Sequence, residues 1–242
     1  MKKLIVMMLL LATGLGAAAQ IRFGIKAGMN ASQFMTGDIA DNNNPNLGGQ
    51  ILDKPMAAIS SASSATIPGF MFGGFANYSF SRVLGVQAEL LFSQQGADMT
   101  YELSLPSTTN SYDRYYYRWR EQTRLNYINL PVLLEVKPFK NIPLGLLAGP
   151  QIGYLVHSSY EGVKTNDDVI MYRKLDVAAV LGIQYTACDH LVVGIRYNAG
   201  LNDVVRSSTY FKHYTIDNNE LIYPDDPRGG THVLQLSVGW RF

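Results

Sequence analysis

The sequence predicts an all-β fold, an eight-stranded antiparallel up-and-down transmembrane β-barrel with long extracellular loops and short periplasmic turns. Apolar and polar residues alternate with a period of two over most of the chain, which is the pattern of strands with two different faces. No segment after the first twenty residues holds the roughly 18 consecutive apolar residues of a spanning helix. Short and long connections alternate along the chain, as they do in outer-membrane barrels.

The composition allows this fold and excludes several other classes of protein. Charged residues make up 16%, which is low against the roughly 25% of ordinary soluble domains. Twenty Lys and Arg against nineteen Asp and Glu leave a net charge of +1, so no overall field recruits nucleic acid. A mean hydropathy of +0.00 is too high for disorder. Cys188 is the only cysteine, which excludes an intramolecular disulfide and a cysteine-cluster metal site.

Residues 1–19 are expected to form a cleaved signal peptide, which leaves residues 20–242 as the barrel domain. Lys2-Lys3 form a basic start, Leu4–Leu11 form an apolar run, and Ala17–Ala19 provide small residues before the cleavage position. The apolar segment is shorter than the roughly 20 residues of a spanning helix, so an uncleaved anchor is the less favoured alternative. The sequence therefore predicts Sec-type export.

Eight strands follow in chain order. The first covers residues 21–30, where an apolar set that includes Phe23 and Ile25 alternates with a polar set that includes Gly24 and Lys26. The next four are expected near residues 69–80, 83–105, 112–136 and 142–158. The last three alternate most regularly and cover residues 175–186, 191–202 and 233–242.

The apolar phase changes within the fourth expected strand. Leu125 and Tyr127 stand at odd positions, whereas Leu130 and Val132 stand at even positions. A β-bulge near Asn129-Leu130-Pro131 would absorb one residue, and a proline suits such an irregular position. The sequence therefore predicts a bulge in this strand.

The connections predict the orientation of the barrel. Long polar loops are expected near residues 35–68 and 207–230, and short turns near Ser81-Arg82, Lys137–Asn141 and Cys188-Asp189. Outer-membrane barrels have short periplasmic turns and longer external loops, and an even number of strands puts both termini on the periplasmic side.

Two all-β alternatives differ in which face contacts water. A soluble lipocalin-like barrel would turn its apolar face inward, whereas a membrane barrel turns it toward lipid. The polar face is rich in glycine and carries single, well-spaced charges instead of a dense charged coat, which favours the membrane barrel. The expected inward charges are Lys26, Glu89, Glu135, Asp176, Arg196 and Arg241. The expected interfacial aromatic residues are Phe23, Phe80, Tyr185, Trp240 and Phe242 at one end and Tyr101, Trp119, Tyr154 and Tyr160 at the other.

The inward charges have two possible roles. They can neutralise one another as a plug, in which Glu89 or Glu135 pairs with Lys26, Arg196 or Arg241. They can also line an ion-conducting constriction. We expect the plug, because eight strands leave little free space inside a barrel.

The third and fourth expected strands are longer than a membrane crossing requires. About 9–11 residues cross the membrane, whereas these two strands together run from about residue 83 to 136. Near their tip lie Tyr112 and the set Tyr115, Tyr116, Tyr117, Arg118, Trp119 and Arg120, which has the composition of a binding hot spot. The hypothesis is a docking surface for a partner protein, a surface glycan or lipopolysaccharide phosphate, and the alternative is an extended aromatic girdle.

No segment of the sequence carries a convincing catalytic, cofactor or metal site. His157 and Ser158 are adjacent in an expected strand and therefore point to opposite faces, so they cannot act together as base and nucleophile. The four histidines show no metal-ligand spacing, and Asp167-Asp168 and Asp225-Asp226 lack the alternating ligands of a calcium loop. The sequence therefore predicts neither an enzyme nor a cofactor.

Six segments, taken in order, resemble a known family. They are Phe23–Asn30, Val86–Gly96, Leu125–Pro131, Leu147–Pro150, Gly194–Leu201 and the terminal strand that ends at Phe242. The set is similar to the outer-membrane β-barrel domain proteins of Bacteroidetes, which are often labelled porin-like or PorT-like.

The resemblance implies insertion into the cell outer membrane and no reaction. It implies that Trp240 and Phe242 belong to a terminal signal for the barrel assembly machinery. The expected function is therefore a non-enzymatic structural or interaction role at the cell surface, with an accessory role in an envelope or secretion complex as one form of it. The expected partners are outer-membrane lipid, lipopolysaccharide, the assembly machinery and other envelope proteins, without nucleic acid. The alternative function is a small porin for ions or small solutes.

Overall fold

The computed structural model describes residues 21–35, 58–106, 114–161, 172–204, 212–216, 219–223 and 229–242. The expected signal peptide, Tyr112 and the two expected aspartate pairs lie outside these residues, as do large parts of the connections expected to be long loops. Within the described ranges, no helix is long and apolar enough to cross a membrane.

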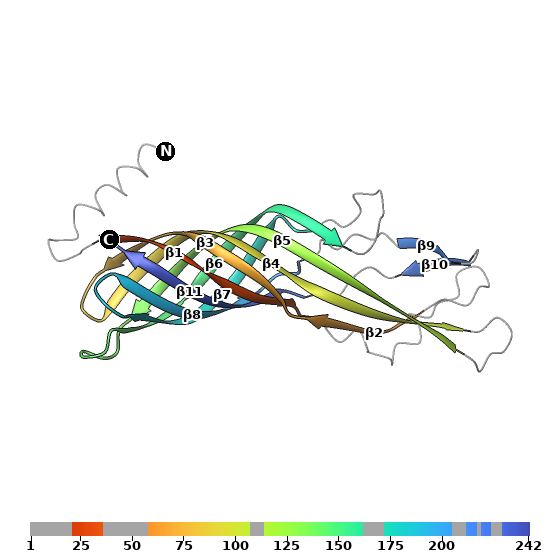
Figure 1. Cartoon of the computed structure of the whole chain (residues 1–242), viewed down its shortest axis with the longest axis horizontal. Helices are drawn as coiled ribbons and strands as arrows, with labels where there is room; N and C mark the ends of the chain where they lie inside the picture. The colour runs from red at the N-terminus through yellow and green to blue at the C-terminus, as the bar shows by residue number, and fades with distance from the viewer. Residues whose placement is uncertain are drawn as a thin grey trace.

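Eight long strands form a closed antiparallel ring (Figure 1). The strands of the ring are β1 (Ile21–Phe34), β3 (Ile67–Ser79), β4 (Leu84–Pro106), β5 (Arg114–Val136), β6 (Leu144–Glu161), β7 (Leu175–Thr186), β8 (Leu191–Gly200) and β11 (Thr231–Arg241). Their order is β4-β3-β1-β11-β8-β7-β6-β5, and the pairing of β4 with β5 closes the ring. The predicted eight-stranded antiparallel ring is confirmed.

Three further strands lie in segments that were expected to be loops. β2 (Ala58–Ala65) pairs with residues 98–104 of β4, whereas β3 pairs with residues 85–93 of the same strand. The expected loop over residues 35–68 is therefore wrong for its last part, because the long β4 provides an edge that β2 occupies. β9 (Lys212–Ile216) and β10 (Asn219–Tyr223) pair with each other within the other expected loop.

Where the structure describes the side chains of the ring strands, buried and exposed residues alternate over most of each strand, apart from Gln95–Met99 of β4, which are all buried. On β7 and β8, for example, Asp176 and Arg196 are buried, whereas Leu181 and Ile195 are exposed. The exposed face is thus apolar and the interior contains the charges, which is the reverse of a water-soluble barrel. The arrangement matches the faces expected from the alternation in the sequence.

The bulge expected in β5 is wrong. Odd-numbered residues of β5 face inward without interruption from Glu121 to Glu135, and the register with β4 does not shift. The register shift lies instead between β5 and β6, where Val156 of β6 has no paired residue. Pro131 only interrupts the ladder with β4, because proline has no N–H to donate. The apolar phase changes because Leu125 and Tyr127 are themselves part of the interior.

Gly96 occupies the point where β4 passes from its pairing with β3 to its pairing with β2. Its φ of 149° is a conformation that residues with a side chain rarely adopt. A Cβ atom at this position would lie 2.0 Å from the carbonyl oxygen of Thr123. Its N–H donates a hydrogen bond of 2.9 Å to Ser32 Oγ inside the barrel. The close approach of three strands here therefore requires glycine.

Candidate functional site

A buried ion-pair cluster crosses the middle of the barrel. Lys26 Nζ on β1 lies 2.8 Å from Glu89 Oε1 on β4. Arg196 on β8 donates two hydrogen bonds to the same carboxylate, of 2.7 Å to Oε2 and 2.6 Å to Oε1. Gln87 Nε2 also donates to Glu89 Oε1, and Lys26 lies 5.0 Å from the centre of the Phe75 ring. The cluster thus joins β1, β4 and β8. Neither β1 nor β8 is a neighbour of β4 in the ring.

The remaining expected inward charges are also buried, and among the described residues only Glu135 is linked to this cluster, because Asn77 donates hydrogen bonds to both Glu135 and Gln87. Glu135 accepts a hydrogen bond of 2.8 Å from Asn77 and lies 3.2 Å from Lys137 Nζ. Arg241 donates to the carbonyl oxygen of Asp189, at 2.8 Å from Nη2. Lys137 was not among the expected inward charges, although it follows Glu135 by two residues and therefore stands on the same side of the strand.

Asp176 lies in another part of the interior. It pairs with Gly153 of β6, which in turn pairs with Asn129 of β5. Its Oδ1 atom is buried and has no hydrogen-bond partner in the described part of the chain. Asp176 and Arg241 therefore stand apart from the hydrogen-bonded network that contains Lys26, Glu89, Arg196 and Glu135.

An apolar cluster fills the interior nearer the β4–β5 hairpin. Its buried members are Phe34, Ala97, Met99, Leu125, Tyr127 and Val204, and Leu155 and Tyr172 pack against them. Leu125 is completely buried, and Thr123 next to the cluster shares a hydrogen bond of 3.2 Å with the Tyr172 hydroxyl. This cluster was not predicted from the sequence, although the change of apolar phase at Leu125 and Tyr127 is its signal. The interior thus contains an ionic layer and an apolar layer in series.

The β4–β5 hairpin extends beyond the barrel (Figure 1). β4 and β5 pair as far as Pro106 with Arg114, whereas the described pairing of β5 with β6 ends at Gln122 with Glu161. Two ion pairs join the hairpin strands, Arg118 with Glu102 and Arg120 with Asp98. The hydrogen bonds to Asp98 and its negative charge raise the pKa of Arg120 above its usual value.

The residues of the expected docking set all lie on β5 within this hairpin. Tyr116, Arg118 and Arg120 are exposed and hold even positions, in phase with the outward-facing residues of β5. Tyr117 holds an odd position and is half exposed. Tyr101 of β4 pairs with Trp119 of β5, so these two residues of the expected aromatic girdle stand opposite each other in the hairpin.

The residues expected at the other interface are exposed on the outer surface. Phe23, Phe80, Tyr185, Trp240 and Phe242 all belong to this exposed apolar set. Trp240 stacks on His190, with ring centres 5.2 Å apart. The N–H of Phe242 donates a hydrogen bond of 2.8 Å to the carbonyl oxygen of Phe23, which fixes the end of the chain to the start of β1.

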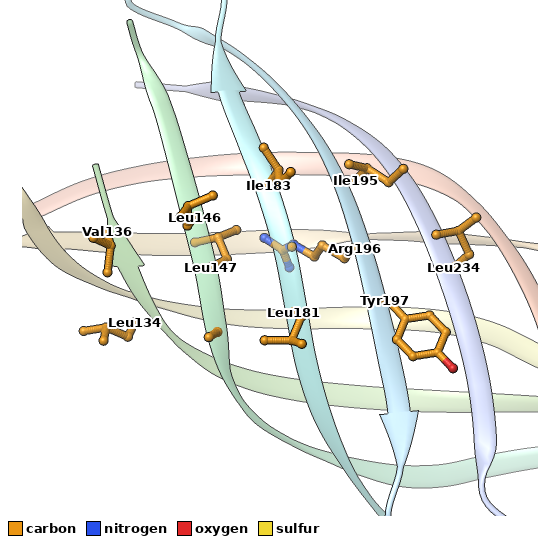
Figure 2. A pocket seen from close by; sticks show the side chains of 12 residues that line it. Leu134, Val136, Leu146, Leu147, Leu181, Ile183, Ile195, Arg196, Tyr197 and Leu234 are labelled. Atoms are coloured by element: carbon orange, nitrogen blue, oxygen red, sulfur yellow. The ribbon is translucent and has the colours of Figure 1, made fainter. Parts of the chain in front are cut away.

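A shallow groove lies on the outer surface over β5, β6, β7, β8 and β11 (Figure 2). It has a volume of about 640 Å³, and outward apolar side chains such as Leu134, Leu181 and Ile195 surround it. Ligand sites generally combine an apolar wall with several convergent polar groups. The described side chains around this groove provide only the inward-facing Arg196, already bound to Glu89, and the hydroxyl of Tyr197.

The histidines occupy separate elements, as expected. His190 Nδ1 lies 2.7 Å from the carbonyl oxygen of Arg241, and His232 contacts the Tyr197 hydroxyl and lies 3.0 Å from Met35 Sδ. His157 is exposed on β6 beside Ser158. Among the residues whose placement is described, no group of three or more His, Cys, Asp or Glu could hold a metal ion.

Comparisons with known proteins place the chain in a family. The model of the family described as "Outer membrane protein beta-barrel domain" matches residues 17–206. No curated protein matches the chain.

Three solved structures are similar to the chain at low identity. Ail, the attachment invasion locus protein of Yersinia pestis, is 13% identical, with a TM-score of 0.39 over 92% of this chain and 99% of that chain. OprG of Pseudomonas aeruginosa is 12% identical, with a TM-score of 0.40 over 91% and 95%. Outer membrane protein W of E. coli is 13% identical, with a TM-score of 0.34 over 91% and 97%. Because the family match covers most of the chain, the protein belongs to the outer membrane protein β-barrel domain family and is located in the outer membrane.

Proposed function

We propose that this protein is a closed, non-enzymatic outer-membrane barrel that presents a docking surface for other envelope proteins outside the cell. The observation that carries the proposal is the contrast between a filled interior and a projecting hairpin. The ionic cluster around Glu89 and the apolar cluster around Leu125 both fill the interior, whereas Tyr116 on the hairpin is 72% exposed. An exposed tyrosine beside arginines is typical of a binding surface and not of a folded core.

The proposal includes an orientation. The connections over residues 80–83, 137–143 and 187–190 are short and lie at the end where β1 begins and β11 ends (Figure 1). Short connections face the periplasm in outer-membrane barrels, so the hairpin end faces outside. The same proposal includes cleavage of residues 1–19, recognition of Trp240 and Phe242 by the barrel assembly machinery, and assignment to the PorT-like Bacteroidetes group on the segments given above. A role in a secretion complex would follow from the identity of the partner.

The docking surface can be tested by affinity purification from detergent-solubilised outer membrane. We expect a protein partner to co-purify with the wild-type chain and to be lost, by about tenfold or more, in the double variant Tyr116→Ala/Tyr117→Ala, because tyrosines at hot spots carry much of the binding energy. Tyr185→Ala is the matched control, since Tyr185 is also half exposed but lies at the opposite end of the barrel. An unchanged partner set in the double variant contradicts the docking surface.

The alternative function is a small porin, and the charged residues inside the barrel favour it. The two packed layers argue against conduction, because ions would have to pass both the Glu89 cluster and the apolar cluster. We expect planar bilayers that contain the purified protein to show no unitary current steps above those of protein-free bilayers. Stable steps with cation or anion selectivity would replace the proposed function with the porin.

A further inference from the structure

The outward face of β5 changes from apolar to basic toward the hairpin. Ile128, Leu130, Val132 and Leu134 are exposed apolar residues on this face. Beyond Asn126, the same even series contains Arg124, Arg120 and Arg118. At about 3.3 Å per residue, Arg124 stands roughly 13 Å along the strand from Ile128, and Arg118 roughly 20 Å further. The three arginines therefore form a column that continues the apolar band, which we call the arginine column.

Residues of β4 hold the arginine column in place. Arg120 Nε donates to both carboxylate oxygens of Asp98, at 2.7 and 2.8 Å. Arg118 Nε donates to Glu102 Oε1 at 2.8 Å, and Arg124 Nη1 lies 3.5 Å from Gln94 Oε1. The side chains of Arg118 and Arg120 nevertheless remain 72% and 73% exposed. A guanidinium carries five N–H donors, so each of these arginines has donors beyond the Nε and Nη2 atoms that contact β4.

We propose that the arginine column binds the lipid A phosphates of lipopolysaccharide in the surrounding leaflet. This inference rests on the orientation given in the proposed function, in which the hairpin end faces outside. Lipid headgroups stand where the apolar band of a barrel ends, which is where Arg124 begins the column. Guanidinium groups match phosphate oxygens in geometry and bind them through two N–H donors at once.

The charges around the column make binding depend on direct contact and not on a general attraction to anions. The three arginines and the two carboxylates of Asp98 and Glu102 leave a net charge of +1, so the long-range field is weak. Binding then depends on short charge-assisted hydrogen bonds from guanidinium groups that β4 already orients.

Binding can be measured with the purified full-length chain in detergent micelles and two probes, phosphorylated lipid A and the same lipid A after removal of its phosphates. We expect the wild type to bind the phosphorylated probe about tenfold more tightly, since hydrogen bonds to charged groups are the strongest of their kind. We expect Arg118→Gln/Arg120→Gln/Arg124→Gln to bind both probes equally. The matched control is Arg82→Gln/Lys140→Gln, which removes two exposed basic residues at the opposite end and should keep the preference.

Heat-modifiable migration in electrophoresis shows whether each variant is folded, and only folded variants are compared. Should the triple variant not fold, the single variant Arg124→Gln, which stands at the level of the lipid headgroups, is expected to lose part of the preference. Equal binding of the two probes by the wild type, or a preference that survives in the folded arginine variants, overturns the inference. Loss of the protein partner in Tyr116→Ala/Tyr117→Ala with intact lipid A binding would support both proposals, whereas an unchanged partner set would overturn only the docking surface.

Discussion

Glu89→Ala is expected to lower the free energy of unfolding by about 3–5 kcal/mol, because removal of one member of a buried ion pair leaves its partners charged and uncompensated. Glu89 contacts both Lys26 and Arg196, and all three side chains are at most 2% exposed. The variant would therefore leave two cations in the barrel interior. Urea unfolding of the purified barrel in detergent micelles, followed by tryptophan fluorescence, measures the change.

Two variants serve as controls for this effect. Glu102→Ala also removes the carboxylate of an arginine pair, but on the exposed hairpin, where such pairs contribute only about 0–1 kcal/mol. Lys26→Met/Glu89→Leu/Arg196→Met removes all three charges at once and should be more stable than Glu89→Ala, because apolar replacement of a whole buried network is often neutral. Equal losses in Glu89→Ala and Glu102→Ala would show that burial does not govern the ion pairs of this barrel.

The ring of strands could be predicted because its cause is local. Each ring strand has one face toward the apolar surroundings and one toward the interior, and this contrast appears directly as alternation in the sequence. The strand expected over residues 175–186 is β7 with the same bounds, and that expected over residues 191–202 is β8 with two residues fewer. β2 could not be recognised in the same way, because its sequence consists mostly of Ala and Ser, which do not distinguish two faces. Its pairing depends on the free edge of β4, a feature of the assembled sheet.

The candidate site could be predicted in part. Parity along the strands identified the inward positions of Lys26, Glu89 and Arg196, and all three are buried. Their pairing across the interior depends on the stagger of strands that are not neighbours, which no local pattern contains. The same stagger links Glu135 to the cluster only through Asn77 and Gln87, and it leaves Asp176 in another part of the interior. A sequence therefore gives the set of inward charges more readily than the pairs they form.

The fourth expected strand, β5, passes both a polar and an apolar part of the barrel interior. The rule that apolar residues face outward holds for Leu130, Val132 and Leu134, which are exposed. It fails at Leu125 and Tyr127, where the interior itself is apolar and includes Phe34 and Met99 from other strands. The change of apolar phase in the sequence therefore reflects a change from a polar to an apolar interior along the strand. The register of β5 with β4 stays constant.

Leu125→Ala tests this interpretation, with an expected loss of about 2–5 kcal/mol in the free energy of unfolding, because it removes buried carbons and leaves a cavity in a packed layer. Leu125 is fully buried among the apolar cluster, which leaves little room for neighbouring side chains to move into the space. The same urea titration in micelles measures the loss. The effect should not depend on the detergent, since the cluster does not contact it.

Leu130→Ala is the matched control, because it makes the same chemical change five residues along the same strand. Leu130 is 48% exposed on the outer face, where an alanine leaves no enclosed cavity and detergent or lipid fills the space. We expect its loss to be about 1 kcal/mol or less, since the packing part of the large-to-small cost is absent there. The bulge inferred from the sequence would place Leu125 and Leu130 on the same outer face and give two small, similar losses. A loss at Leu125 several times that at Leu130 requires instead that the odd-numbered residues of β5 face inward throughout, and that Leu125 packs in the apolar cluster inside the barrel.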